Sequence, residues 1–178
     1  MKRLPLSLAL AGLLIAGCGE DEKPEPRPGT QGGGEVSGPG FTTETPEGFT
    51  GGGGREGRVG LTLLGPLEGG GFPPNITVGR SPAPPNASVE QLRGSIRSQS
   101  EAQGGRDVEE LSDREIDDEP AIGVTYSRTA PQAKLTQRTY AVVHRGSLYT
   151  IAATTPEKST VDGEKALETV LDAWSWVK

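Results

Sequence analysis

Side chains with acid–base or nucleophilic chemistry are scarce in this 178-residue chain, which contains one cysteine and one histidine. A Cys/His zinc site and an internal disulfide both need more such residues than the chain has. The histidine ends the segment Tyr140-Ala-Val-Val-His144, whose alternation places Tyr140, Val142 and His144 on one strand face. With no second histidine and no serine or cysteine motif nearby, a hydrogen-bonded strand histidine is favoured over a general base.

The densest charge lies in residues 107–119, which hold eight acidic residues and one arginine. On a straight strand Asp113, Glu115 and Asp117 would share one face at a spacing of roughly 6.5–7 Å. Such a row could bind a hard cation such as Ca²⁺, but a calcium loop wraps its ligands around one centre, whereas a straight strand points them in parallel. We therefore favour a solvated sheet edge, where charge blocks edge-to-edge pairing, and keep the three carboxylates as weak metal candidates.

A run of four glycines, Gly51 to Gly54, is the remaining motif with possible chemistry, since glycine-rich loops can cradle phosphate. The run lacks the Lys-Ser/Thr pair and the strand-to-helix context of a phosphate loop, so we interpret it as a flexible loop. The formal net charge of −6 argues against a nucleic-acid partner, which requires a clustered basic face. The sequence predicts no cofactor, no catalytic residue and no enzymatic activity.

The N-terminus has the pattern of an export signal. A positive start, Met1-Lys2-Arg3, precedes 12 uncharged residues (4–15), which is too short for a membrane-spanning helix. Residues 14–18, LIAGC, resemble the bacterial lipobox. The resemblance implies cleavage between Gly17 and Cys18, a diacylglyceryl group on the Cys18 thiol, and attachment to the extracytoplasmic side of the cell membrane. The alternative is an ordinary secretory signal with an incidental cysteine.

The chain after the signal divides into a linker and one domain. Residues 19–40 contain 11 glycines or prolines and a single aliphatic side chain, Val36, so we expect residues 18–40 to form a lipidated, disordered tether. From residue 41 the composition becomes globular, and residues 41–178 carry a net charge of −5. We expect this acidic domain to stand off an anionic bilayer.

Hydrophobic patterns predict the elements of the domain. Ser88 and Gln91 form a capping box before an apolar stripe that ends at a Gly-Gly pair, which indicates a helix. A second helix is expected over 160–177, with Trp174 on its buried face and Trp176 beside it. Period-two segments and turn residues predict strands over 41–49, 59–64, 72–78, 108–117, 121–128, 135–145 and 147–154, with turns at 118–120 and 145–147. This order indicates an α+β fold: an antiparallel sheet of six to seven strands packed with two main helices in an α/β/α-type sandwich.

Four segments in that order carry a resemblance to a known family: PEGF (46–49), PNITV (74–78), IDDEPAIGVTY (116–126) and YAVVHRGSLYTIAAT (140–154). Together they resemble the PsbP/DcrB-type α/β sandwich, and in particular actinobacterial lipoproteins of the LpqN kind. The resemblance implies a binding or accessory domain without a common active site. No catalytic residue is carried over from it.

Two functions remain open. The first is a non-catalytic envelope lipoprotein that binds a protein partner, and an exposed apolar patch would favour it. The second is a carrier of a lipid or small apolar ligand between sheet and helices, which would need a cavity. Several small residues could leave room for that cavity: Ala121, Gly123, Ala141, Ala152 and Ala153. A hydrolase is the least supported function.

Overall fold

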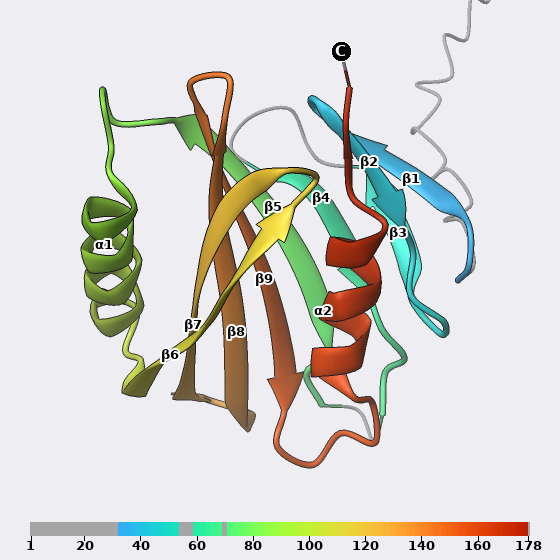
Figure 1. The fold of residues 1–178 in the computed structure, drawn as a ribbon. Coiled ribbons are helices and arrows are strands. Elements are labelled where there is room, and N and C mark those ends of the chain that lie inside the picture. Colours follow the sequence, from blue (N-terminus) through green and yellow to red (C-terminus); the bar gives the residue numbers. More distant parts are fainter. Residues whose placement is uncertain (1–31, 54–58, 69–70, 178) are drawn as a thin grey trace, which may run out of the picture.

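A seven-stranded antiparallel sheet forms the centre of the fold in the computed structural model, which describes residues 32–53, 59–68 and 71–177 (Figure 1). The strand order is β3-β4-β5-β9-β8-β7-β6, so most neighbours are joined by hairpins. The strands are β3 Thr50–Gly53, β4 Val59–Leu64, β5 Asn75–Pro82, β6 Arg106–Ile116, β7 Glu119–Ala130, β8 Ala133–His144 and β9 Ser147–Pro156.

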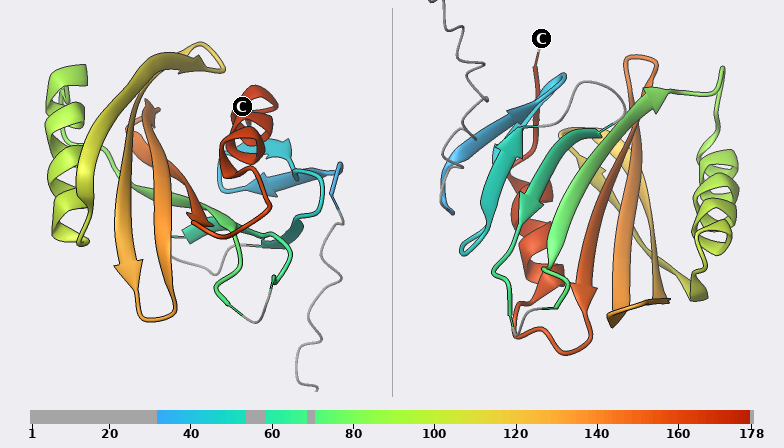
Figure 2. Two further views of the ribbon diagram at one scale, coloured as in Figure 1. Left: turned by 90° about the horizontal axis from the view of Figure 1, so that it is seen from below. Right: turned by 180° about the vertical axis from the view of Figure 1, so that it is seen from behind.

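Two helices lie on opposite sides of this sheet (Figure 2): α1 spans Val89–Ala102 and α2 spans Gly163–Asp172. A small sheet of order β1-β2-β10 lies beside α2 and consists of Glu35–Gly38, Phe41–Glu44 and Ser175–Trp176. The predicted α+β sandwich with an antiparallel sheet of six to seven strands and two main helices is therefore confirmed. No helix among the described residues is both long and apolar enough to cross a bilayer.

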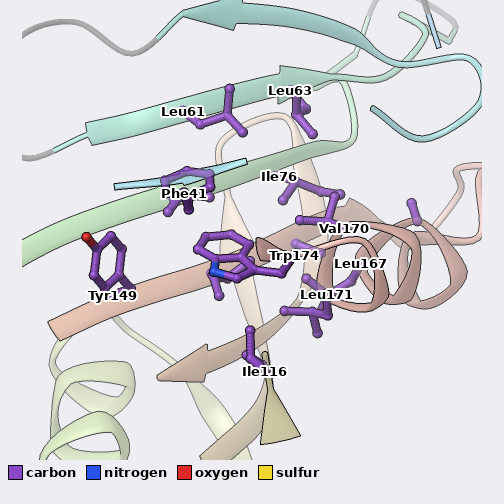
Figure 3. Packing of buried hydrophobic residues seen from close by; sticks show 14 of the residues in the cluster. Phe41, Leu61, Leu63, Ile76, Ile116, Tyr149, Leu167, Val170, Leu171 and Trp174 are labelled. Atoms are coloured by element: carbon purple, nitrogen blue, oxygen red, sulfur yellow. The ribbon is translucent and has the colours of Figure 1, made fainter. Parts of the chain in front are cut away.

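The main core lies between the sheet and α2 (Figure 3). Phe41 stacks on Trp174 with ring centroids 4.0 Å apart, and Tyr149 meets Phe41 edge-on at 6.1 Å. Aliphatic side chains of β4, β5, β9 and α2 fill the space around these rings. Aromatic pairs in these geometries contribute beyond their buried area, so this face holds the most cohesive part of the domain.

The opposite face has a smaller core, in which Leu92 and Ile96 of α1 pack on Ile122, Val124 and Tyr126 of β7. The predicted capping box starts the helix: the Ser88 hydroxyl accepts from the Gln91 N–H at 3.2 Å, and the Gln91 side chain accepts from the Ser88 N–H at 3.1 Å. These two bonds satisfy backbone donors that the first helical turn leaves without partners.

The second helix is shorter than predicted. It begins after Asp162, whose carboxylate accepts from the Lys165 N–H at 3.0 Å, and it ends at Asp172 instead of continuing to residue 177. Ser175 and Trp176 instead form β10, which pairs with β2. The helical spacing of the apolar residues was misleading, because tertiary hydrogen bonds and packing of Trp176 override the local pattern.

Two glycine-rich segments also differ from expectation. Gly51 to Gly53 belong to β3 and pair with β4, so the predicted flexible loop is wrong there, while Gly54 lies outside the described residues. Glu35–Gly38, expected in the tether, form β1 and pair with β2. Half-buried Val36 packs against the main core, which gives this strand a reason to form despite its glycine-rich context. Residues 18–31 lie outside the described residues.

Both tight turns at the upper end of the sheet use residues with positive φ. The predicted turn at 145–147 is confirmed, with φ of 47° at Arg145 and 72° at Gly146. The turn predicted at 118–120 lies slightly earlier, at Asp117 and Asp118, with φ of 46° and 66°. Two consecutive positive φ values define the hairpin turn that suits strand twist, and Asp tolerates this conformation better than most residues. Consequently Glu119 and Pro120 begin β7.

Candidate functional site

The acidic stretch does not form a row of parallel carboxylates. β6 is interrupted by two register shifts, and Asp113 points to α1, where it binds the Arg93 guanidinium at 2.8 Å. Asp117 lies in the hairpin turn, and its carboxylate accepts from the backbone N–H of Trp176 at 2.7 Å. Glu115 lies opposite Pro120 in the β6–β7 pair. The structure therefore separates the three metal candidates, and the part of the chain that it describes contains no cluster of three or more potential ligands.

Arg93 connects helix α1 to the acidic stretch on β6. Its guanidinium also contacts Glu110 at 3.2 Å, so one side chain of α1 spans two carboxylates of β6. The hydrogen bond to Asp113 is the main reason why the pKa of Arg93 is raised above its ordinary value. The charge of the sheet edge thus has a structural use, in addition to discouraging edge-to-edge pairing.

His144 is enclosed by its neighbours. Its Nδ1 lies 2.9 Å from the Glu119 carboxylate, and its ring stacks on Trp176 with centroids 4.2 Å apart and an interplanar angle of 1°. The side chain is 14 % exposed, and its Nε2 is buried without a partner among the described residues. His144 is therefore a hydrogen-bonded histidine on a strand, as predicted, and its one polar contact among the described residues is with Glu119 of the neighbouring strand β7.

The acidic turn and the lone histidine, distant in sequence, meet at the chain's C-terminal segment. We call Asp117, Glu119, His144 and Trp176 the C-terminal clasp, because Asp117 and His144 both contact Trp176. The neighbouring Val177 N–H donates to the Gly40 carbonyl at 3.1 Å and closes the same region. This arrangement fixes β10 beside β2, and its polar groups face one another instead of a cavity.

A pocket of about 780 Å³ lies at the opposite end of the sheet, among three loops. We call it the loop pocket; its lining residues are Glu68, Gly71, Phe72, residues 132–134 and residues 156–160. These loops connect β4 to β5, β7 to β8 and β9 to α2, and the last of them lies at the bottom of Figure 1. The volume falls within the range of about 300–1,000 Å³ typical of small-molecule sites.

Hydrogen bonds join the loops of this pocket. The Glu68 carboxylate accepts from the Thr160 N–H at 2.9 Å and from the Thr160 hydroxyl, which mainly accounts for its lowered pKa. The Glu157 N–H donates to the Lys134 carbonyl at 2.9 Å. The lining combines apolar groups with two lysines and two glutamates, a composition suited to a ligand that has an apolar body and a polar end.

Sequence reasoning did not identify the loop pocket. Its residues come from three connections and the strand ends beside them, and none of them matches a motif for chemistry. The only usable signal was the position of each connection: all three join elements at the same end of an antiparallel sheet. Without the strand order, nothing in the sequence places residue 72 beside residues 134 and 158.

A second, smaller cavity of about 200 Å³ lies between α1 and the sheet. Its lining is uncharged and includes Thr77, Gln99, Thr139 and Thr150, so it is not the apolar cavity anticipated for a lipid carrier. Of the five small residues expected to leave room, only Ala152 lines it. At Gly123 the space is filled, because a Cβ there would lie 2.7 Å from the Tyr140 ring.

Comparison with solved structures identifies the fold class as PsbP-like. LpqN of Mycobacterium tuberculosis, described as involved in cell envelope biogenesis, superposes with a TM-score of 0.56 at 12% identity, over 82% of this chain and 90% of LpqN. The cyanobacterial PsbP of Synechocystis sp. PCC 6803 gives a TM-score of 0.53 at 18% identity, over 78% and 87% of the two chains.

A protein of unknown function from Pseudomonas aeruginosa, PA94, is similar at a TM-score of 0.51 and 15% identity, over 71% of this chain and 85% of its own. No protein-family model and no curated protein sequence matches the chain. At these identities the likeness is one of fold. The PsbP-like fold and the resemblance to LpqN predicted from the sequence are confirmed at that level.

Proposed function

We propose that the protein is a lipid-anchored accessory protein of the cell envelope, whose PsbP-like domain binds a protein partner without catalysing a reaction. The observation that carries this proposal is that the residues capable of acid–base or metal chemistry contact other residues of the fold. His144 and Asp117 hold Trp176, and Asp113 holds Arg93, so these groups stabilise the fold. The fold shared with LpqN, whose described role is in the envelope, supports the same assignment.

The lipobox-like sequence supplies the proposed anchor at Cys18. Sixteen residues separate Cys18 from the start of β1 at Glu35, and they span at most about 55 Å when fully extended. Two acyl chains give stable attachment, whereas one chain is marginal. The domain would therefore act within a few tens of ångströms of the bilayer, where an envelope partner is accessible.

Replacing Cys18 with serine tests the anchor. We expect Cys18→Ser to abolish labelling by a fatty-acid analogue in the source cell and to leave the signal uncleaved by the lipoprotein peptidase. The purified full-length variant should show the same unfolding transition as the purified wild-type protein, which separates loss of lipidation from loss of folding. Persistent fatty-acid labelling of the variant would overturn the anchor.

Photo-cross-linking in intact cells tests partner binding. A photoreactive residue would replace Gln99 on α1 in one strain and the exposed Glu168 on α2 in another, so that opposite sides of the sheet are compared. We expect one discrete adduct from one side, and its loss in the Cys18→Ser background. Diffuse labelling from both sides would contradict a specific partner, and the same adduct in the Cys18→Ser background would overturn the role of the anchor in binding it.

A second candidate function, the carrying of a small amphiphilic ligand, is favoured by the loop pocket. The pocket has a ligand-sized volume, and hydrogen bonds between its loops hold its walls in place. This site lies at the end of the sheet, in contrast to the cavity between sheet and helices that was anticipated. It is independent of a protein partner and has its own test below.

A further inference from the structure

We infer that the loop pocket binds an amphiphilic organic anion, meaning a ligand with one carboxylate or similar group and an aliphatic body. The inference rests on the carrier function proposed above and names its ligand class. It depends on three features of the pocket: its apolar surface, its cationic groups and the engagement of one of its carboxylates.

The apolar surface comes from one connection and two strand ends. Phe72 of the β4–β5 connection, Ala133 at the start of β8 and Pro156 at the end of β9 line the pocket. Removing an aliphatic chain from water stabilises the bound state, so even partial contact with these residues favours an alkyl body. The methylene stems of the lining lysines extend the same apolar surface.

The cationic groups are Lys134 and Lys158. Residues 41–178 contain four lysines, so half of them border this one pocket in a domain of net charge −5. Every ion pair between described residues has an arginine or the histidine as its cation. Within the described ranges the two ammonium groups are therefore available to a ligand anion, and each offers three donors.

The two carboxylates of the lining are in different situations. Glu68 is engaged by the Thr160 N–H and hydroxyl, and it ties two walls of the pocket together. Glu157 anchors its own backbone to Lys134 but makes no side-chain hydrogen bond or ion pair among the described residues. A bound anion would be attracted by both lysines and repelled by Glu157. Neutralising a lysine should therefore lower the affinity for an anion, and neutralising Glu157 should raise it.

Isothermal titration calorimetry with three ten-carbon probes tests the ligand class on the soluble domain carrying residues 32–178. The probes are decanoate, decan-1-ol and decyltrimethylammonium, each below its aggregation concentration. We expect decanoate to bind at least about fivefold more tightly than decanol, and decyltrimethylammonium to bind more weakly than both.

Matched variants locate the site. Lys134→Gln and Lys158→Gln should each weaken decanoate binding by about threefold and change decanol binding much less, because glutamine removes the charge but keeps part of the apolar stem. Lys165→Gln is the control, because this exposed lysine of α2 does not line the pocket, and it should change nothing. Glu157→Gln should tighten decanoate binding, and Phe72→Ala should weaken decanoate and decanol equally.

Each outcome separates the ligand class from the broader function. Equal affinities for decanoate and decanol, with no effect of either lysine variant, would overturn the anionic class and leave the carrier function standing. Absence of binding by all three probes would overturn the carrier function together with the ligand class. Neither result affects partner binding, which the cross-linking experiment decides separately.

Discussion

The two ends of the seven-stranded sheet use their polar residues in opposite ways. At the upper end in Figure 1, the tight turns of two hairpins bring Asp117 and His144 against Trp176, and Glu119 contacts His144 from the neighbouring strand. At the lower end, two longer connections, β4–β5 and β9–α2, lie beside the two-residue β7–β8 turn and leave a pocket of about 780 Å³ bordered by Lys134 and Lys158. The first end is a structural clasp, and the second has the features of a binding site.

The contrast shows that chemical residue types alone are a poor guide to a site. The lone histidine and the acidic stretch attract attention in the sequence, yet they lie where the chain closes on itself. Lys134 at the start of β8 and Lys158 in the β9–α2 connection attract none, although residues in and beside loops on a rigid sheet are common in binding sites. Whether a side chain is engaged by neighbours or left facing a cavity is decided by strand order and turn geometry.

The largest expected loss of stability comes from a substitution in the aromatic core next to the clasp. Trp174→Ala should lower the free energy of unfolding by about 3–5 kcal/mol, because it empties a large buried volume and removes the stack on Phe41. Phe72→Ala, at the loop pocket, is the matched change at the other end and should cost about 1 kcal/mol or less. Urea unfolding of both variants measures the difference, and similar losses would abolish the proposed contrast.

A smaller effect is expected within the clasp itself. Asp117→Ala removes the acceptor of the Trp176 backbone N–H and places alanine at positive φ. We therefore expect the free energy of unfolding to fall by about 1–2 kcal/mol. Asp117→Asn keeps an acceptor and tolerates the same φ, and should cost less than about 0.5 kcal/mol. Thermal unfolding distinguishes them; if both variants resemble the wild type, Asp117 does not hold the C-terminal strand.

The smallest effect is a pH dependence at the loop pocket. The folded-state pKa of Glu68 is lowered below its ordinary value of 4.5, so its contribution to stability is present above that pH. It is lost as the pH falls through the folded-state pKa. Glu68→Gln should therefore show a slightly shallower loss of stability than the wild type on acidification below pH 4.5. Parallel acid-unfolding curves would show that the contact with Thr160 is not maintained in solution.

Local signals in the sequence predicted much of the fold. The capping box at Ser88, the hairpin at Arg145 and Gly146, and the alternating strands all depend on neighbours a few residues away. The errors occurred where distant contacts decide. Trp176 leaves the helical pattern because Asp117 and His144 hold it, and Gly51 joins the sheet because β4 supplies the pairing. The loop pocket could not be predicted, because it requires three connections to meet in space.

An amide chemical-shift map of the isotope-labelled domain, recorded during titration with decanoate, tests the central contrast most directly. Binding at the loop pocket predicts shifts confined to residues 132–134 and 157–160 and to the neighbourhood of Phe72, with the amides of His144 and Trp176 unchanged. Shifts centred on the clasp, or no shifts at either end, would contradict the assignment of binding to the lower end of the sheet.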